Sequence, residues 1–568
     1  MTTDKSIKSK KQKQAIIRLI TMTGIVVCVN ILASYYHYGI DLTKEKRFTL
    51  TGPTKKLLNN LTETVEVDVY LKGKFPAEIQ RLQEAVRERL QSFKDIAGNR
   101  LVYRFSDPFE GKSEDEQKNI ANALDQKGIK VMPLQVKGEE EYSVKPFFPW
   151  AMVRYNGREK PIKLTETVHG GSPAENISYS ESLLEYKFAS AINEMGRPDK
   201  PRIAYITGNG EPIDIHIQDA ISTLMQYYHL DTLNLTQGIH IPILYDAIII
   251  TKPTVAFTEP EKLKIDQYVM HGGHILWALS MLNASLDSLT NAPMFIALDY
   301  GLNLDDMLFN YGVRINSNLI EDMQCEKLPT FYNGNSQEPR PWIYSPVFDP
   351  TSQHIIVRNM QPVLSMFPNS IDTIATPGIK KTILLQSSKY SRSANAPVRV
   401  SLSTMNYLPR ENMFNKHSIP AAVLLEGAFH SAYKNRLAAE YLHILNDSLH
   451  LPFKGECDSS NSMIVISDGN IMSNDYATKE GVLPMGYWKW TGNFYSNKDF
   501  LLNCMEYLTD RSGILEARSK ESKLRLLDSG RVKEEKDKWE IINVVVPVAI
   551  VLVFASCYFF FRKRRYET

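Results

Sequence analysis

The sequence predicts an α/β protein in which two membrane-spanning helices flank a folded region that contains two α/β domains. Three observations support this class. One long apolar segment lies near each end of the 568-residue chain. A strand–helix–strand pattern follows the first segment, and the centre of the chain holds continuous apolar strands that alternate with helices. The second pattern is typical of a doubly wound, largely parallel sheet covered by helices on both faces.

The two apolar segments cover residues 15–36 and 541–561. At about 1.5 Å per residue, either one is long enough to cross a hydrocarbon core of about 30 Å. A cleaved signal peptide is the alternative for the first segment, since a lysine-rich start and an apolar stretch are shared by both. No pair of small residues precedes a cleavage point, so an uncleaved span is favoured. We therefore expect transmembrane helix 1 at 15–36 and transmembrane helix 2 at 541–561.

The charges beside the spans favour cytoplasmic tails at 1–14 and 562–568. Basic residues on the loop side balance those of the N-terminal tail, so charge counting alone does not decide the orientation. Long loops translocate largely regardless of charge, and both short tails are nearly free of acidic residues. The large region is therefore expected outside the cytoplasm.

Residues 41–195 are predicted to form a small α/β domain. Its expected elements are a strand at 65–71, a helix at 77–96, a strand at 101–105, a hairpin at 151–164 and a helix at 181–195. The hairpin turns at Asn156-Gly157, a pair favoured in type I′ turns because both central residues need positive φ. Gly196-Arg197-Pro198 ends the last helix and marks the domain boundary.

Residues 196–514 are predicted to form the doubly wound domain, with a β-rich insertion at about 280–405. Its expected elements are strands at 202–207, 247–250, 275–279 and 463–467, and helices at 215–228, 258–270 and 499–508. Thr258 and Glu261 form a capping box at the start of the second helix. Residues 515–540 are predicted to form a charged stalk that runs into the second span.

The sequence shows no complete catalytic, cofactor or metal site. Segment 106–113 (SDPFEGKS) partly matches a phosphate-binding loop, but it begins with serine where glycine is needed, and Pro108 removes an amide donor. His271 and His274 have no third ligand at metal-like spacing. The net charge of +2 gives no sign of a nucleic-acid partner. We expect no cofactor, no metal and no nucleic acid.

The five cysteines indicate neither a disulfide framework nor a catalytic thiol. Cys28 and Cys557 lie in the predicted spans. The folded region contains three cysteines, Cys325, Cys457 and Cys504, and an odd number cannot all be paired in disulfides. A sheet of this kind can hold a nucleophile on a strand-to-helix turn, but none of these cysteines fits that position. Ser280 follows a strand but lacks the G-x-S-x-G surroundings. We therefore expect that the protein is not an enzyme.

Three polar loops and two span positions are the candidate interaction sites. The loop residues are Gly208, Asn209, Gly210 and Glu211, then Gly272 and Gly273, then Asp468 and Asn470. Loops at the carboxyl ends of parallel strands are where such sheets bind ligands. A structural role is the alternative, since glycines form tight turns and polar side chains cap helices. Asn543 and Pro547 are candidate packing positions for partner helices in the membrane.

Several segments also carry a family resemblance. They are, in order, DLTKEKRFTLT (41–51), ITGNGE (206–211), YDAIII (245–250), TEPEKLKIDQYVMHGGHILWAL (258–279), SDGN (467–470) and WEIINVVVPVAIVLVF (539–554) with its basic tail. With these segments the chain resembles the gliding-motility GldG family, the auxiliary membrane subunit of an ABC-type transport system in Bacteroidetes. The family strand ends more often in histidine before Gly-Glu, so Asn209 is a mild departure.

The resemblance implies a fold, a location and partners. The central domain is expected to be amidotransferase-like (flavodoxin-like), similar to a domain of intraflagellar transport proteins that lacks catalytic residues. The large region is expected in the periplasm of a bacterial inner-membrane protein, with a polytopic ABC permease and a separate ATPase subunit as partners.

We therefore expect a non-catalytic accessory subunit of an ABC-type transporter that acts in gliding motility or surface-protein export. The alternative is a membrane-tethered ligand-binding receptor or hydrolase that uses the loops at the carboxyl ends of the central sheet.

Overall fold

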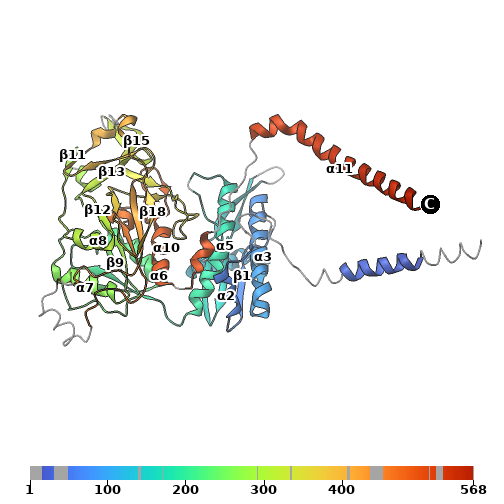
Figure 1. Cartoon of the computed structure of the whole chain (residues 1–568), viewed down its shortest axis with the longest axis horizontal. Coiled ribbons are helices and arrows are strands. Elements are labelled where there is room, and N and C mark those ends of the chain that lie inside the picture. The colour runs from blue at the N-terminus through green and yellow to red at the C-terminus, as the bar shows by residue number, and fades with distance from the viewer. Residues whose placement is uncertain are drawn as a thin grey trace, which may run out of the picture.

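The structure is a computed structural model that describes residues 16–30, 49–73, 75–137, 142–168, 170–290, 292–332, 335–405, 410–434, 436, 452–510, 512–519 and 529–566. Its architecture is mixed α/β, as predicted. An N-terminal α/β part lies between a larger central part and two apolar helices, which both lie at the right of the view (Figure 1).

The N-terminal part is built on a four-stranded sheet of order β2-β1-β5-β6. The strands are β1 (Val65–Val69), β2 (Leu101–Phe105), β5 (Trp150–Tyr155) and β6 (Arg158–Lys163), covered by helices α2 (Gly52–Asn59), α3 (Ala77–Ala97) and α5 (Pro173–Gly196). Helix α4 (Glu114–Gln126) and the hairpin β3 (Met132–Lys137)–β4 (Tyr142–Phe147) complete this part. The strands β1 and β2 are parallel, while β5 pairs antiparallel with β1 and with β6.

Local sequence explains the turn of this sheet and the start of its long helix. Asn156 and Gly157 have φ values of 50° and 69°, which confirms the predicted turn between β5 and β6. Helix α5 begins at Pro173 rather than at residue 181, because Ser172 and Glu175 form a capping box just before it.

The central part is built on a seven-stranded sheet of order β18-β21-β22-β10-β9-β7-β8. The parallel strands are β7 (Arg202–Thr207), β8 (His229–Asn234), β9 (Ala247–Thr251), β10 (His274–Ala278) and β22 (Asn461–Ile466). The antiparallel strands are β21 (Pro420–Gly427) and β18 (Ile379–Gln386). Strand β18 lies within the predicted insertion, so this segment contributes directly to the main sheet.

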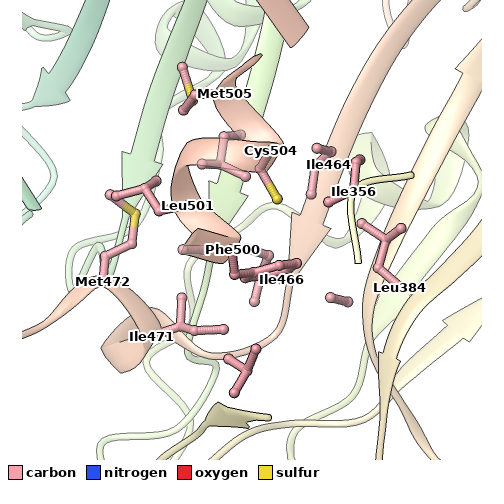
Figure 2. Packing of buried hydrophobic residues seen from close by; sticks show 14 of the residues in the cluster. Ile356, Leu384, Ile464, Ile466, Ile471, Met472, Phe500, Leu501, Cys504 and Met505 are labelled. Atoms are coloured by element: carbon pink, nitrogen blue, oxygen red, sulfur yellow. The ribbon is translucent and has the colours of Figure 1, made fainter. Parts of the chain in front are cut away.

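Helices cover both faces of the central sheet. One face carries the 3-10 turn η2 (Ile215–Ile217), α6 (Gln218–Tyr227) and α10 (Asn497–Thr509), and the other carries α7 (Glu259–Met270) and α8 (Asp305–Tyr311). Phe500 and Cys504 of α10 pack with Ile464 and Ile466 of β22 (Figure 2). The intervening β22 residue Val465 belongs to the opposite face. Burial on both faces explains why the residues from Met463 to Ile466 of this strand are all apolar.

Small sheets and 3-10 turns form the β-rich remainder. The strands are β11 (Met294–Ala297), β12 (Val313–Ile315), β13 (Asn318–Asp322), β14 (Cys325–Tyr332), β15 (Asn335–Phe348), β16 (Val363–Leu364), β17 (Ile371–Thr373), β19 (Ser391–Asn395), β20 (Val398–Ser401), β23 (Tyr476–Ala477), β24 (Gly481–Val482), β25 (Tyr487–Trp488) and β26 (Asn493–Phe494). The turns are η3 (Leu286–Leu289), η4 (Leu402–Met405), η5 (Glu411–Met413) and η7 (Gly469–Met472). Many of these elements share one apolar core that includes Trp342 and Trp488.

The chain returns to the N-terminal part after α10. The 3-10 turn η8 (Ile514–Ser519) contacts α2 and α5, and Ile514 is buried in the core of the N-terminal part. The segment predicted as a charged stalk, 515–540, therefore begins with a packed turn. Both ends of the folded region meet here, because a Cβ atom on Gly513 would lie 3.3 Å from the Pro53 ring.

One helix in the described part of the chain is long and apolar enough to cross a membrane. It is the segment Lys538–Arg564 of α11 (Ser529–Tyr566), which contains Pro547. The apolar helix near the N-terminus is described as Ile16–Asn30, and the rest of the predicted first span, 15–36, lies outside the described residues.

Candidate functional site

A cleft of about 1140 Å³ opens at the carboxyl edge of the central sheet. It lies at the ends of β7 and β9, which are neighbours in the sheet. The chain leaves β7 for β8 on one side and then returns to β9 on the other side. This is the topological switch point at which open α/β sheets bind ligands.

The floor and the walls of the cleft differ in polarity. The strand-end loops supply the polar groups Asp214, His216, Lys252, Thr254, Asn470 and Asn474. The β-rich region supplies an apolar wall that includes Leu328, Leu364, Met366, Leu402 and Met405. Trp490, which is 43% exposed, also lines the cleft together with its neighbour Lys489.

The predicted loop after β7 contributes only partly to the cleft surface. Gly210 lines the cleft, whereas Asn209 and Glu211 are buried. The Asn209 side-chain amide donates to Glu261 of α7 at 3.2 Å, and its backbone N–H donates to Glu211 at 2.8 Å. Burial raises the pKa of Glu211. These contacts attach the loop to the capping box of α7.

Two glycines of this loop occupy crowded positions with left-handed backbone. Gly208 has φ of 123°, and a Cβ atom there would lie 2.8 Å from the Asn234 side-chain oxygen. Gly210 has φ of 81°, and its Cβ atom would lie 2.1 Å from the Thr254 hydroxyl. A larger residue at either position would therefore displace a neighbouring loop.

The predicted loop after β22 connects the sheet to the β-rich wall. Asp468 is buried and accepts hydrogen bonds from the Ser365 hydroxyl at 2.7 Å and the Met366 N–H at 2.9 Å. Burial raises its pKa. Asn470 lines the cleft, donates to the Met366 carbonyl at 2.9 Å and accepts from Lys252 at 2.6 Å.

The third predicted loop lies at the opposite end of the sheet. Gly272 and Gly273 immediately precede β10, so they are at its amino end and far from the cleft edge. Gly273 lies against the ring of Tyr268, since a Cβ atom there would approach that ring to 2.2 Å. In the part of the chain that the structure describes, no group of three or more His, Cys, Asp or Glu residues is placed to hold a metal ion.

Lys252 is a candidate residue that the sequence patterns did not reveal. It follows β9 directly and has φ of 47°, a left-handed conformation that is uncommon for lysine. Burial lowers the pKa of its ammonium, while the nearby Asp468, Asp287 and Asp214 oppose that shift. A lysine directly after a buried strand at a switch point is the signal that could have identified it.

The three thiols of the folded region pack among other side chains, and none of them lines the cleft. Cys504 lies within the apolar cluster around α10 (Figure 2), and burial raises its pKa well above the ordinary value. Burial also raises the pKa of Cys457, and that of Cys325 to about 12. The thiolate is the nucleophilic form of cysteine, so these environments disfavour nucleophilic attack. The Ser280 hydroxyl is buried and accepts from the Gly469 N–H at 2.9 Å.

Comparisons with known proteins match both folded parts. A family model described as ABC-type uncharacterized transport system matches residues 200–504, and a Domain of unknown function (DUF7088) matches residues 44–154. An uncharacterized protein of Borreliella burgdorferi is 22% identical over 586 residues, which cover 98% of this chain and 99% of that protein.

Two solved structures show only weak similarity to the fold. The mmIFT52 N-terminal domain has a TM-score of 0.30 and 12% identity, covering 54% of this chain and 97% of that domain. The exo-beta-1,4-mannosidase Op5Man5 from Opitutaceae bacterium strain TAV5 has a TM-score of 0.21 and 10% identity, covering 81% of this chain and 52% of that enzyme. Similarity at this level supports no argument about fold or function.

Proposed function

We propose, from the premise that this chain belongs to the ABC-type uncharacterized transport system family, that it is a non-catalytic accessory subunit which holds a recognition domain beside a membrane transporter. The observation that carries the proposal is the combination of a cleft-bearing domain, matched by the family model, with a membrane-competent helix on the same chain. The buried thiols described above are consistent with a non-catalytic role.

We further propose a two-pass topology with both tails in the cytoplasm and the folded region in the periplasm of a bacterial inner membrane. The meeting of the chain ends supports this arrangement. Thr51, which precedes α2, donates its backbone N–H to the fully buried Glu185 of α5 at 2.7 Å, and η8 packs beside α2 and α5. The first and last described segments of the folded region therefore lie together on the N-terminal part, at α2 and α5.

The partners in this proposal are a polytopic permease and a separate ATPase, and the process is gliding motility or surface-protein export. Asn543 and Pro547 lie in the apolar part of α11 and are exposed. Among the described residues, the Asn543 amide has no hydrogen-bond partner. An amide in hydrocarbon is stabilised by a polar group on a neighbouring helix, so this position suits a helix–helix contact. In the same proposal the central domain is amidotransferase-like, which its parallel strands and two helical layers support.

The test is purification of the tagged full chain from native membranes in several mild detergents. We expect a permease and an ATPase to be recovered with it. Asn543→Leu should reduce their recovery several-fold, whereas Ser556→Ala should not, because the Ser556 hydroxyl is already bonded to Leu552 in its own helix. Recovery of a lone chain in every detergent would contradict the proposal.

Ligand recognition is a second proposed function, which is compatible with the first. Gly210, Lys252 and Asn470 follow three different strands and line one cleft, as a receptor site requires. The hydrolase alternative has less support, since the His216 ring bonds to the carbonyl of Asn474 and not to a serine among the described residues. Binding assays on the cleft, rather than turnover assays, are therefore the appropriate test.

A further inference from the structure

The structure holds Lys252 in a backbone conformation that the surrounding loops enforce. Its N–H donates to the Ala278 carbonyl of β10 at 2.8 Å. Gly469 lies directly against it, because a Cβ atom on Gly469 would approach the Lys252 Cβ atom to 2.8 Å. Two neighbouring strand ends therefore fix a left-handed lysine, and strained residues of this kind concentrate at ligand sites.

Among the described residues, the ammonium of Lys252 forms no direct ion pair. Its hydrogen bond goes to the neutral side-chain amide of Asn470 at 2.6 Å, and no carboxylate oxygen of the described residues lies within 4.0 Å. The acids of the cleft have other contacts: Asp214 accepts from the His216 N–H at 3.0 Å, Asp287 accepts from the Ser285 hydroxyl at 3.3 Å, and Asp475 pairs with Lys489 at 3.2 Å. The carboxylates of Asp468, Asp287 and Asp214 act on the Lys252 ammonium only from beyond 4.0 Å. A partly buried cation gains most from an anion in direct contact, which a ligand would supply.

The cleft beside Lys252 has an apolar wall and is larger than an inorganic anion needs. Asn470, which holds the ammonium, also bonds to the Met366 carbonyl, so the apolar wall begins next to the cation. Leu286 and Leu289 of η3 line the same cleft. Drug-sized molecules occupy pockets of about 300–1000 Å³, and this cleft is of that order.

We propose that the cleft binds an anionic amphiphile. One carboxylate or phosphate group accepts hydrogen bonds from the Lys252 ammonium and the Asn470 amide, and an apolar body packs against the wall that includes Leu364 and Met366. This inference rests on the proposed function of the cleft as a ligand site. It adds the chemical class of the ligand and the residue that selects it.

The test uses the full chain in phosphatidylcholine nanodiscs, with equilibrium dialysis against empty nanodiscs as the reference. The probes are 2-naphthoate, its neutral counterpart 2-naphthylmethanol, and inorganic phosphate. We expect 2-naphthoate to bind at least tenfold more tightly than either of the other two. Equal binding of the alcohol would overturn the anion requirement, and equal binding of phosphate would overturn the apolar requirement. Absence of binding by all three probes would instead reject the cleft as a ligand site.

Two lysine variants distinguish a specific contribution of Lys252 to anion binding from a general effect of the protein's positive charge. Lys252→Met should weaken 2-naphthoate binding at least tenfold and leave 2-naphthylmethanol binding unchanged. Lys380→Met is the matched control, because this exposed lysine lies on β18 and is not part of the cleft lining. Unchanged 2-naphthoate binding by Lys252→Met would overturn the proposal.

A second variant keeps the lysine and adds an internal anion. Asn470→Asp places a carboxylate next to the ammonium, so it should also weaken 2-naphthoate binding at least tenfold. Retained 2-naphthoate affinity in this variant would overturn the proposal even if Lys252→Met fails to fold.

A last arm identifies the source of the ligand. If the natural ligand is an anionic lipid, nanodiscs that contain phosphatidylglycerol should compete with 2-naphthoate in the parent protein. If it is a soluble molecule, the affinity should be equal in both kinds of nanodisc. Either result supports the shared chemistry when the charge dependence on Lys252 is present.

Discussion

The phenol of Tyr186 on α5 donates a hydrogen bond of 2.5 Å to the partly buried carboxyl of Glu506 on α10, which joins the N-terminal part to the central part. The Arg518 guanidinium lies over the Tyr186 ring, 5.3 Å from its centroid, and pairs with Asp499 at 3.3 Å. The junction is therefore a polar network within a partly buried contact. Such networks stabilise a contact only while their charges remain balanced.

Glu506→Gln should remove a pH dependence of folding. Burial raises the pKa of Glu506 from 4.5 to about 7. Between these values the folded protein retains a proton that the unfolded chain has released, so stability falls as the pH rises through this window. The glutamine variant should abolish up to about 3 kcal/mol of that fall. The measurement is the free energy of unfolding of the full chain, obtained with denaturant at several values from pH 5 to pH 8.

The control for this prediction is Glu480→Gln, which changes an exposed carboxyl outside the junction. It should leave the pH dependence of the unfolding free energy as in the parent. An unchanged pH slope in Glu506→Gln would show that the carboxyl of Glu506 is not the group that titrates.

Arg518→Met should weaken the junction itself. Arg518 is 6% exposed and interacts with both Tyr186 and Asp499, so its loss removes a cation from a buried network. Removal of one partner of a buried pair costs about 3–5 kcal/mol, and we expect about 2–3 kcal/mol here because the Asp499 side chain is 43% exposed. Unfolding free energy and protease sensitivity are the measurements.

The control is Lys498→Met, which removes a partly exposed ion pair with Asp219 and should cost less than about 1 kcal/mol.

Local pattern was sufficient to predict four of the five parallel strands of the central sheet, namely β7, β9, β10 and β22. The strand at 202–207 was predicted with its observed bounds, because a short apolar run bounded by a turn is typical of a strand with both faces buried. Strands β8, β18 and β21 of the central sheet were not predicted. Strand β8 is an edge strand of mixed polarity, and β18 pairs with β21, a segment distant in sequence that no local periodicity reveals.

The candidate site could be located from the sequence, but its chemistry could not. The rule for strand ends placed the loops after β7 and β22 at one edge, where the structure also has its cleft. The same rule, applied strictly, would have excluded Gly272 and Gly273 from the candidate site, because they precede their strand and therefore lie at its amino end. The role proposed for Lys252 depends on its φ angle and on the distant Gly469, and local spacing in the sequence reveals neither.

Gly273→Ala should destabilise the fold without changing ligand binding at the cleft. The added methyl group would approach the Tyr268 ring to 2.2 Å, and displacement of that ring would break the hydrogen bond of its hydroxyl to the Tyr245 carbonyl. We expect a loss of about 2 kcal/mol, measured by denaturant unfolding. Gly52→Ala is the control, since its Cβ atom would meet no other atom within 4 Å. A change in cleft affinity in Gly273→Ala would contradict the separation of the two ends of the sheet.

Cysteine labelling should distinguish the two-pass topology from its alternatives. Lys380→Cys presents a thiol on an exposed position of β18, and Thr568→Cys presents one at the end of the basic tail. Burial raises the pKa of the native Cys325, Cys457 and Cys504, so these thiols should contribute little background labelling.

In cells with a permeabilised outer membrane, an impermeant maleimide should label Lys380→Cys rapidly. It should label Thr568→Cys only after the inner membrane is opened, because a basic tail is retained in the cytoplasm. Immediate labelling of the tail, or protection of position 380, would place the folded region on the opposite side and exclude periplasmic recognition.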